Sequence, residues 1–346
     1  MIYNRALKDY YSDSKGHEDQ LIPFLLGRNA FNYLIASLNI NTILLPSFIC
    51  PMVVDIFKNS GIKIIFYHNL DSQLDSPIQP ILKILSDISV DDNTFFLWHD
   101  YLNLIGDMPD ELYEALEKNN IKAIIDASHS LPSKEYKCSN VVYGFRKLLS
   151  QPFGSLLKIK EKKYLPTNEI ALIKVFKFLV FHKVQSIIFT IFKRFHNNLL
   201  NSLLKKISIF GDRYSFDKND YFIKDKYNFK KILSLHSLLD YNKIGIKRRK
   251  NFLQYLTAFP QKLNLNSLDI SCPYGFPLMV NNNTKIRSKL WNAGIHSFIL
   301  WGSIHKDVLE RNNNINCLLD SLLILPVNQD LSSDDIKKII EIINVY

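Results

Sequence analysis

One lysine, one aspartate and one histidine form a set that could do chemistry together. Lys147 lies in the segment FRKLL, residues 145–149, and Asp126 and His129 precede it by about twenty residues. A lysine amine can form a covalent link to a carbonyl carbon and move protons as a base, a carboxylate can pair with a cationic ring nitrogen, and an imidazole can donate a hydrogen bond. Taken singly, Lys147 is typical of a surface charge, Asp126 of a helix cap, and His129 of a satisfied structural histidine.

Two further features could hold a flat, anionic ligand. Phe48 follows an apolar run at 42–46, where an aromatic ring could cover a ligand face or simply pack in the core. Arg28 and Asn29 stand at the expected start of a helix, where backbone amides lacking helical partners favour an anion. The motif GRNA at 27–30 is weak alone, and its place about twenty residues before Phe48 strengthens it.

The helices and strands that must position these residues indicate an α/β fold. Between residues 28 and 159, short apolar runs alternate with stretches of helical periodicity, which is typical of a mostly parallel sheet with crossover helices. Strands are predicted at 42–46, 62–67, 94–99 and 121–126, and helices at 29–38, 50–59 and 109–119. Ligands of open α/β sheets bind beyond the carboxyl ends of the strands, which is where Asp126 is expected.

A smaller α+β domain is predicted over residues 241–346, after a large domain over 1–240. The pattern predicts helices at 241–259 and 284–293, strands at 276–280 and 322–326, and a last helix capped by Ser332 or Ser333. Residues 161–210 form a basic, apolar helical insertion. Its charged residues interrupt the apolar run well short of the about 20 residues of a spanning helix, so it either lies on a membrane surface or packs against the enzyme or a second subunit.

Composition excludes several classes of protein. With 47% hydrophobic residues in 346, the chain can bury a large core, which excludes a disordered or fibrous protein. The net charge of +10 is spread along the whole length, so nucleic-acid binding is not expected. The four cysteines are widely separated and read as reduced thiols with no zinc site. The amino terminus lacks the apolar region of a signal peptide, so a cytoplasmic protein is expected.

Four segments resemble, in order and spacing, the DegT/DnrJ-type sugar aminotransferases, which are fold-type-I enzymes dependent on pyridoxal phosphate. They are GRNA at 27–30, LPSFICP at 45–51, IDASH at 125–129 and FRK at 145–147. The resemblance is clear over about residues 25–160 and loose over 240–345. It implies the fold-type-I architecture, a large domain with a central mostly parallel sheet and a smaller carboxyl-terminal α+β domain.

The resemblance also implies a role for each residue. Lys147 would form the Schiff base with pyridoxal phosphate and then act as the base that moves the α-proton. Asp126 would pair with the pyridine nitrogen, His129 would donate to the phenolic oxygen, and Phe48 would cover the ring face. The amides of Arg28 and Asn29 would bind the phosphate.

Two departures from the family pattern bear on activity. Many relatives carry a serine that contacts the phosphate just before the FRK segment, whereas this chain has Tyr143 and Gly144 there, so Tyr143 or Ser139 would have to replace that hydroxyl. Gly154 is followed by Ser155 in place of a second glycine, which matters if that position needs a positive φ. Asn228 is a weak candidate for a phosphate ligand supplied across a dimer.

The implied function is transfer of an amino group, with glutamate as the expected donor, to a nucleotide-linked keto sugar in surface-glycan biosynthesis by a homodimer. A lyase or dehydratase of the same fold is an alternative, although Lys147 argues against those dehydratases in which histidine replaces the lysine. A non-catalytic protein that binds a membrane surface or partner through 170–210 is a further alternative. His99, Trp301 and His305 are each plausible substrate-side groups, and each is more often structural.

Overall fold

The structure is a computed structural model that describes residues 20–24, 26–68, 78–88, 91–132, 134–144, 147–149, 154–160, 240–260, 268–301, 304–309 and 314–345. The predicted insertion at 161–210, Asn228, and the Phe145 and Arg146 of the lysine motif lie outside the described residues.

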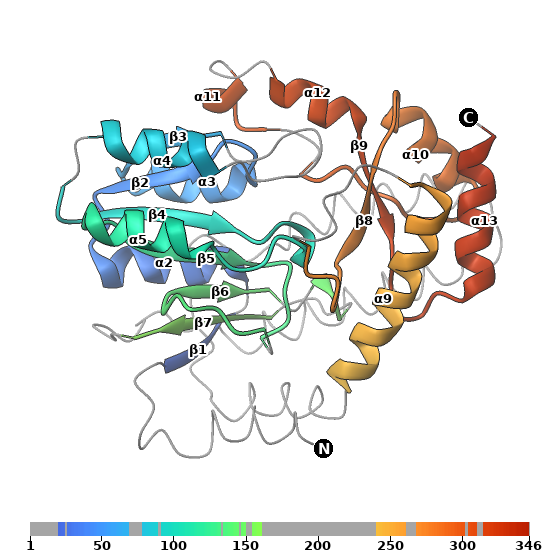
Figure 1. Cartoon of the computed structure of the whole chain (residues 1–346), viewed down its shortest axis with the longest axis horizontal. Helices are drawn as coiled ribbons and strands as arrows, with labels where there is room; N and C mark the ends of the chain where they lie inside the picture. Colours follow the sequence, from blue (N-terminus) through green and yellow to red (C-terminus); the bar gives the residue numbers. More distant parts are fainter. Residues whose placement is uncertain are drawn as a thin grey trace, which may run out of the picture.

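A seven-stranded sheet forms the larger part of the molecule (Figure 1). Its strands are β1 (Gln20–Phe24), β2 (Thr42–Pro46), β3 (Lys63–Tyr67), β4 (Thr94–His99), β5 (Lys122–Ala127), β6 (Val141–Tyr143) and β7 (Ser155–Ile159). Their order is β1-β7-β6-β5-β4-β2-β3. The strands β2 to β6 are parallel to one another, and β7 runs antiparallel to both β6 and β1. The predicted mostly parallel sheet is therefore confirmed.

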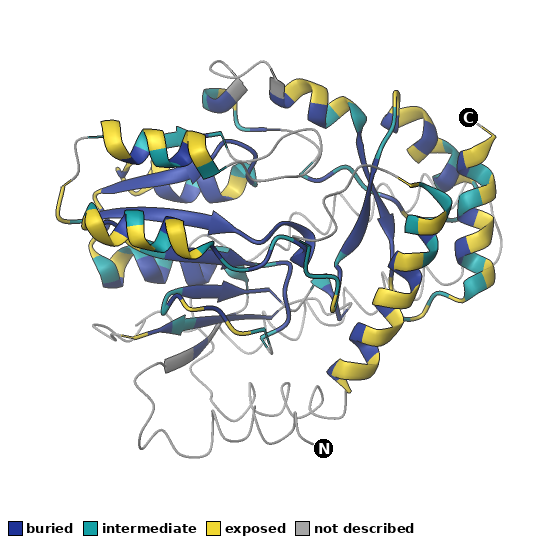
Figure 2. Ribbon diagram, viewed as in Figure 1, coloured by how far each residue is buried: buried dark blue, intermediate teal, exposed yellow. Residues whose placement is uncertain are grey.

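Helices cover both faces of this sheet, which is why its central strands β2 and β4 are buried along their whole length (Figure 2). They are α2 (Gly27–Leu38), α3 (Pro51–Asn59), α4 (Ile78–Asp87) and α5 (Asp110–Lys118). Successive residues of β4 point to opposite faces: Phe95 and Leu97 share a core with α2 and α3, and Phe96 and Trp98 share one with α4 and α5. Helix α2 begins at Gly27, two residues before its predicted start, with no side-chain cap on Leu26.

The carboxyl-terminal part packs helices around a two-stranded antiparallel sheet. It contains α9 (Tyr241–Ala258), β8 (Gly275–Met279), α10 (Asn283–Asn292), α11 (Lys306–Leu309), α12 (Asn314–Ser321), β9 (Leu322–Pro326) and α13 (Ser333–Asn344). Of the two expected caps of α13 the structure uses Ser332, whose hydroxyl accepts from the amide of Asp335 while the Asp335 carboxylate accepts from the amide of Ser332. Within the described residues, no helix combines the length and apolarity that membrane crossing requires.

The segment 268–274 joins the two parts. The amide of Tyr274 donates to the carbonyl of Leu102 at 2.8 Å, and the side chain of Asn103 donates to the carbonyl of Cys272 at 2.6 Å. These bonds hold Leu102 and Asn103 at φ values of 56° and 58°, which are rare for residues other than glycine. The division at residue 240 remains a prediction, since the chain on its amino-terminal side is not described.

Candidate active site

The candidate residues gather at the carboxyl edge of the parallel strands. Phe48 follows β2, His99 ends β4, Asp126 lies one residue before the end of β5, and Gly144 follows β6. Lys147 comes three residues after Gly144. Four neighbouring strands thus deliver their loops to one place, which is where ligands of open α/β sheets bind.

Asp126 is a buried carboxylate with a histidine beside it. Its side chain is 2% exposed, its Oδ2 lies 3.1 Å from Nδ1 of His99, and its Oδ1 accepts a hydrogen bond from the amide of Ser128 at 3.0 Å. Burial raises the pKa of Asp126, but the charges of His99 and Lys147 and the bonds it accepts outweigh burial, so its pKa is lowered. The group is therefore an ionised carboxylate at neutral pH.

Sequence reasoning did not assign His99 to Asp126, although a signal for the pair exists. The two residues are register partners on the adjacent parallel strands β4 and β5. Both strands were predicted, but that they are neighbours was not. Once the two strands pair in this register, His99 and Asp126 must lie side by side.

His129 is held as a neutral imidazole with a defined tautomer. Its Nδ1 accepts a hydrogen bond from the amide of Leu102 at 3.2 Å. Burial, followed by the charges of Lys147 and His99, lowers the pKa of His129 well below its usual value. Since Nδ1 is the acceptor of a neutral ring, Nε2 carries the hydrogen and is a donor. The ring also stacks on Tyr274, with centroids 4.8 Å apart and planes 10° apart.

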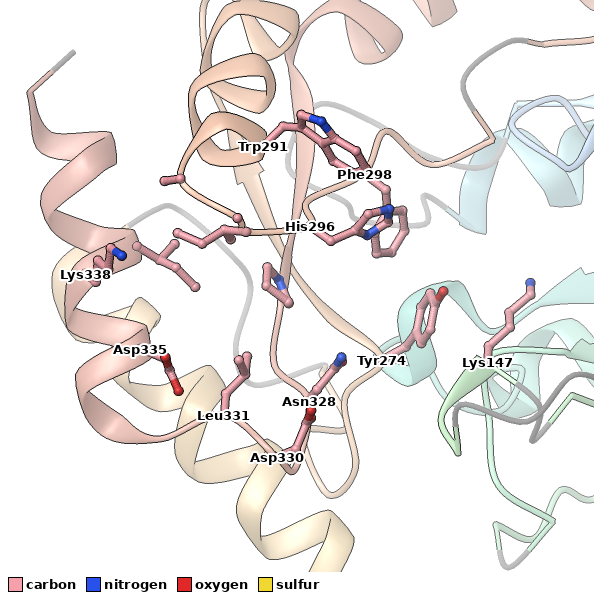
Figure 3. Close-up of a pocket in the computed structure, with 15 residues that line it drawn as sticks. Lys147, Tyr274, Trp291, His296, Phe298, Asn328, Asp330, Leu331, Asp335 and Lys338 are labelled. Atoms are coloured by element: carbon pink, nitrogen blue, oxygen red, sulfur yellow. The ribbon is translucent and has the colours of Figure 1, made fainter. Parts of the chain in front are cut away.

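Lys147 reaches this group from a short turn after β6. Its charge is close enough to affect the pKa of Asp126, His129 and Cys50. It also lines a cavity of about 490 Å³ that extends along the carboxyl-terminal part (Figure 3). The other cavity walls include Tyr274, Trp291, His296, Phe298, Asp330, Asp335 and Lys338.

A second lysine near the site, Lys134, is held between two carboxylates. Its ammonium lies 2.8 Å from Asp100 and 3.0 Å from Asp269. Burial lowers the pKa of Lys134, but the two carboxylates more than offset that, and the pKa is raised. An amine held charged between two carboxylates is a poor nucleophile, so Lys134 is a poor candidate for covalent chemistry.

Several aromatic side chains pack around His99, the partner of Asp126. Phe48 is 1% exposed, and its ring lies 4.9 Å from that of Trp301 and 6.0 Å from that of Tyr101. The indole of Trp301 also lies 5.5 Å from the ring of His99 and 6.4 Å from that of His129. Trp301 adopts a φ of 62°, and bulky residues rarely take this conformation unless their surroundings hold them in it.

Trp301 is thus brought into the site from the carboxyl-terminal part, and His99 joins it there. His305, the third residue singled out with them, lies elsewhere. Its Nε2 is 3.5 Å from Asp55 on α3, and its Nδ1 accepts from the amide of Asp307 at 3.2 Å. The structure therefore brings together two of these three residues and gives His305 a role between α3 and α11.

The start of α2 lies beside this edge of the sheet. A side chain at Gly27 would place its Cβ 3.8 Å from Val142 on β6 and 3.9 Å from the hydroxyl of Ser155 on β7. The amide of Asn29, however, already donates to the carbonyl of Leu26 at 3.0 Å. The amide of Asn29 therefore has a partner in the first turn, which starts two residues earlier than predicted; its part in phosphate binding is untested and remains a prediction. Phosphate binding by the amide of Arg28 remains a prediction.

The structure accounts for both departures from the family pattern. A Cβ at position 144 would lie 2.3 Å from the carbonyl oxygen and 2.8 Å from the Cα of Ser128, so β6 can approach this backbone only with glycine there. At the second departure the positive φ, 137°, belongs to Gly154, while Ser155 begins β7 and its hydroxyl donates to the carbonyl of Tyr143 at 2.7 Å. The Tyr143 hydroxyl donates to the carbonyl of Lys134.

Replacing Gly144 by serine should therefore destabilise the protein rather than improve it. The new Cβ would meet backbone atoms of Ser128, which cannot rotate away. We expect a loss of about 1–3 kcal/mol in the free energy of unfolding, measured by urea denaturation. Gly61→Ser is the control, because its Cβ would meet nothing within 4 Å, so it carries the strain of its φ of 73°, which Gly144 does not have, and no close contact. A Gly144→Ser loss no larger than that of the control would contradict the close approach.

The neutral state of His129 predicts a dependence of stability on pH. Because its pKa in the folded state is lowered, the unfolded chain binds a proton near pH 6.5 that the folded protein does not. The contribution of His129 to the free energy of unfolding should therefore be constant above about pH 6.5. Below that pH, it should fall by up to about 1.4 kcal/mol per pH unit. His129→Gln keeps polar groups at this position and removes the titration. Urea denaturation from pH 7 to pH 5 should show a shallower decline for the variant, and parallel declines would refute a neutral His129.

These residues fit pyridoxal phosphate. An ionised carboxylate suits a protonated pyridine nitrogen, and the Nε2 hydrogen of His129 suits a phenolic oxygen. The buried Nε2 of His99 and hydroxyl of Ser47 have no hydrogen-bond partner within the described part of the chain, as expected where a polar ligand completes the site. Phe48 supplies an apolar face, and Lys147 an amine.

Solved structures share this fold over nearly the whole chain. The Streptococcus pneumoniae protein Spr1654, described as a sugar aminotransferase, matches in its apo form with a TM-score of 0.65 at 12% identity, covering 99% of this chain and 89% of that one. A DegT DnrJ EryC1 StrS aminotransferase from Brucella abortus gives 0.64 at 13% identity, with coverage of 99% and 89%. The sugar aminotransferase CalS13 from Micromonospora echinospora gives 0.61 at 12% identity, with coverage of 99% and 90%.

At the level of sequence, no family model and no curated protein matches the chain. Identities near 12% carry the backbone arrangement and not the chemistry, which must come from the site itself. The chain has the fold-type-I architecture of the DegT/DnrJ-type sugar aminotransferases.

Proposed function

We propose that this protein is a pyridoxal-phosphate-dependent aminotransferase that moves an amino group from glutamate to a nucleotide-linked keto sugar in surface-glycan biosynthesis. One observation carries the proposal. An ionised Asp126, a neutral His129 with a defined donor, and Lys147 meet at the carboxyl edge of the sheet, within mutual electrostatic range. These are the groups that the cofactor requires, and they come from separate strands and loops.

Each residue has a chemical task in this proposal. Lys147 would hold the cofactor covalently, and its amine is the group that would act as the base for proton transfer. Asp126 stays ionised and holds a positive charge on the pyridine nitrogen, which its short distance from His99 supports. His129 donates from Nε2. When bound, pyridoxal phosphate supplies an electron sink for the charge that develops at the substrate carbon.

The site also restricts water. Phe48, Tyr101 and His129 are all buried, and Trp301 packs among them. A site from which water is excluded would strengthen the interaction of the buried Asp126 carboxylate with a cationic ring. The cavity beside Lys147 offers a path for the substrates.

The solved neighbours support the proposal by analogy of fold. Spr1654 has been solved in PLP and PMP forms, which are the two forms of the cofactor that a transamination interconverts. Glutamate as donor, the nucleotide on the sugar and the homodimer remain predictions from the resemblance, while the cytoplasmic location and the membrane contact through 170–210 remain predictions from the sequence itself. The lysine at position 147 disfavours the dehydratase alternative.

The test is spectroscopic. Purified protein with added pyridoxal phosphate should show a band near 400–430 nm, roughly the range for this cofactor bound to a lysine. Addition of L-glutamate should remove the band, and a keto-sugar nucleotide should then restore it, whereas D-glutamate should do neither. A protein that shows no band would support the non-catalytic alternative. A band that persists with L-glutamate would exclude glutamate as the donor.

A further inference from the structure

Arg248, on the buried face of α9, donates hydrogen bonds to three neutral groups. It is 1% exposed. Its Nε donates to the carbonyl of Pro273 at 2.8 Å, its Nη2 to the carbonyl of Tyr274 at 2.9 Å, and its Nη1 to Oε1 of Gln329 at 2.7 Å. Burial lowers the pKa of Arg248, and the charge of Asp330 is among those that oppose the shift. Burying a guanidinium is costly, and here its planar set of donors ties α9 to Pro273, Tyr274 and Gln329.

One branch of this network leads to the turn that carries Lys147. Gln329 accepts from Arg248 and donates through Nε2 to the carbonyl of Leu148, at 3.4 Å. Leu148 is the next residue after Lys147 and is itself buried. Figure 3 shows Asn328 and Asp330, which flank Gln329, on the side of Tyr274 away from Lys147. Two side chains therefore connect α9 to the backbone of the lysine turn.

The other branch leads to His129. Arg248 holds the carbonyl of Tyr274, the amide of Tyr274 donates to the carbonyl of Leu102, and the amide of Leu102 donates to Nδ1 of His129. The ring of Tyr274 also stacks on the imidazole of His129. Tyr274 thus sets both the ring plane of His129 and the bond that defines its tautomer.

The packing of α9 leaves little freedom for this arrangement. A Cβ at Gly245, one turn before Arg248, would lie 2.9 Å from the carbonyl oxygen of Ser271. The helix therefore lies directly against segment 268–274. A shorter side chain at position 248 could not draw the helix closer to recover the lost bonds.

We propose that Arg248 is a positioning residue that fixes the Lys147 turn through Gln329 and the His129 ring through Tyr274. The inference rests on the proposed function, because it assigns Arg248 an effect on the lysine and imidazole used there. Arg248 itself makes no contact with the reacting atoms. Its effect is to keep two groups from different strands of the large domain in register with the carboxyl-terminal part.

The experiment compares Arg248→Lys and Gln329→Ala with Arg249→Lys in the cofactor-loaded protein. Arg249 is the matched control, because it is the next residue on the same helix and is exposed. Arg248→Lys keeps the charge but loses the fork of donors. We expect it to shift the pH midpoint of the 400–430 nm band by about half a unit or more and to lower kcat about 10- to 100-fold with little change in KM. Gln329→Ala should shift the midpoint in the same direction by less, and Arg249→Lys should change neither quantity.

The double variant Arg248→Lys with Gln329→Ala tests the path itself. Residues acting in one network give effects that do not add, so the double variant should resemble Arg248→Lys alone. Additive effects would overturn the path through Gln329. A fall in Tm with an unchanged band midpoint and unchanged kcat would show that Arg248 only stabilises the fold. If Arg248 variants fail to fold, a Gln329→Ala protein with wild-type midpoint and kcat overturns the proposal.

Hydrogen exchange separates this inference from the proposed function. In the cofactor-free protein, the amides of Leu102 and Tyr274 should exchange at least about tenfold faster in Arg248→Lys than in Arg249→Lys, because their acceptors are held by the network. If wild-type protein shows no cofactor band while this difference appears, the proposed function fails and the tie from Arg248 to His129 stands. Equal exchange in the two variants overturns that tie whatever the cofactor does.

Discussion

Lys147→Ala is expected to lower kcat/KM by at least about 10⁴-fold and to remove the 400–430 nm band. The substitution deletes the covalent anchor and the proton carrier together, and each is worth orders of magnitude in rate. The fold should survive, because Lys147 is only half-buried and lines a cavity. The measurements are the absorbance of protein mixed with pyridoxal phosphate, steady-state kinetics, and thermal unfolding to check the fold.

Lys118→Ala is the control for this substitution, since Lys118 is exposed at the end of α5 and should change nothing. A band that survives Lys147→Ala would sink the assignment of this lysine. Lys134 would then be the next lysine to test, but its two carboxylate partners make it a poor choice for covalent chemistry. Loss of the band with retention of full activity would refute the cofactor chemistry as a whole.

Asp126→Asn should have a different signature, because it removes a charge and leaves the amine in place. The band should persist, while kcat falls by about 10²- to 10³-fold, the usual cost of losing one preorganised electrostatic contact at a developing charge. An amide can still occupy the space beside His99 and accept from Ser128, so packing is preserved. The measurement is kcat with saturating cofactor, together with the affinity for pyridoxal phosphate from titration of the band.

Asp110→Asn is the matched control, since Asp110 is exposed in the first turn of α5, well outside the site. A wild-type kcat for Asp126→Asn would contradict the pairing of this carboxylate with a ring nitrogen. Loss of the band in Asp126→Asn but not in Asp110→Asn would instead make Asp126 a requirement for holding the cofactor.

Much of the fold follows from local sequence. The runs at β2, β4 and β9 are apolar at every or nearly every position because both of their faces are covered, and such runs are legible without a structure. The cap of α13 is equally local, because Ser332 and Asp335 satisfy each other's backbone amides three residues apart. Gly294, with a φ of 76° just beyond the end of α10, is another local signal.

The candidate site could be predicted in part for the same reason. Asp126 lies near the end of β5 and Phe48 follows β2, two strands that are recognisable by themselves, and strand ends are where α/β sheets bind ligands. Lys147 was singled out by its motif together with the residues before it. The start of α2 is harder to predict, because Leu26 offers no capping side chain. The helix begins two residues before its predicted start, and the amide of Asn29 donates to the carbonyl of Leu26.

Only the tertiary structure decided which groups meet. That β4 pairs with β5, and so sets His99 beside Asp126, depends on the whole sheet order, which no local pattern contains. Gly144 is required by the backbone of Ser128, a contact across two strands. The tautomer of His129 depends on Leu102, whose unusual φ is held by segment 268–274.

The sequence by itself therefore determined the secondary structure around the site and the types of residue that could do chemistry, because both depend on neighbours along the chain. The tertiary structure alone decided their protonation and partners, because burial and charge depend on residues far apart in the chain. Lys147 shows both sides: its motif is local, while the tie through Gln329 to Arg248 exists only in the folded protein.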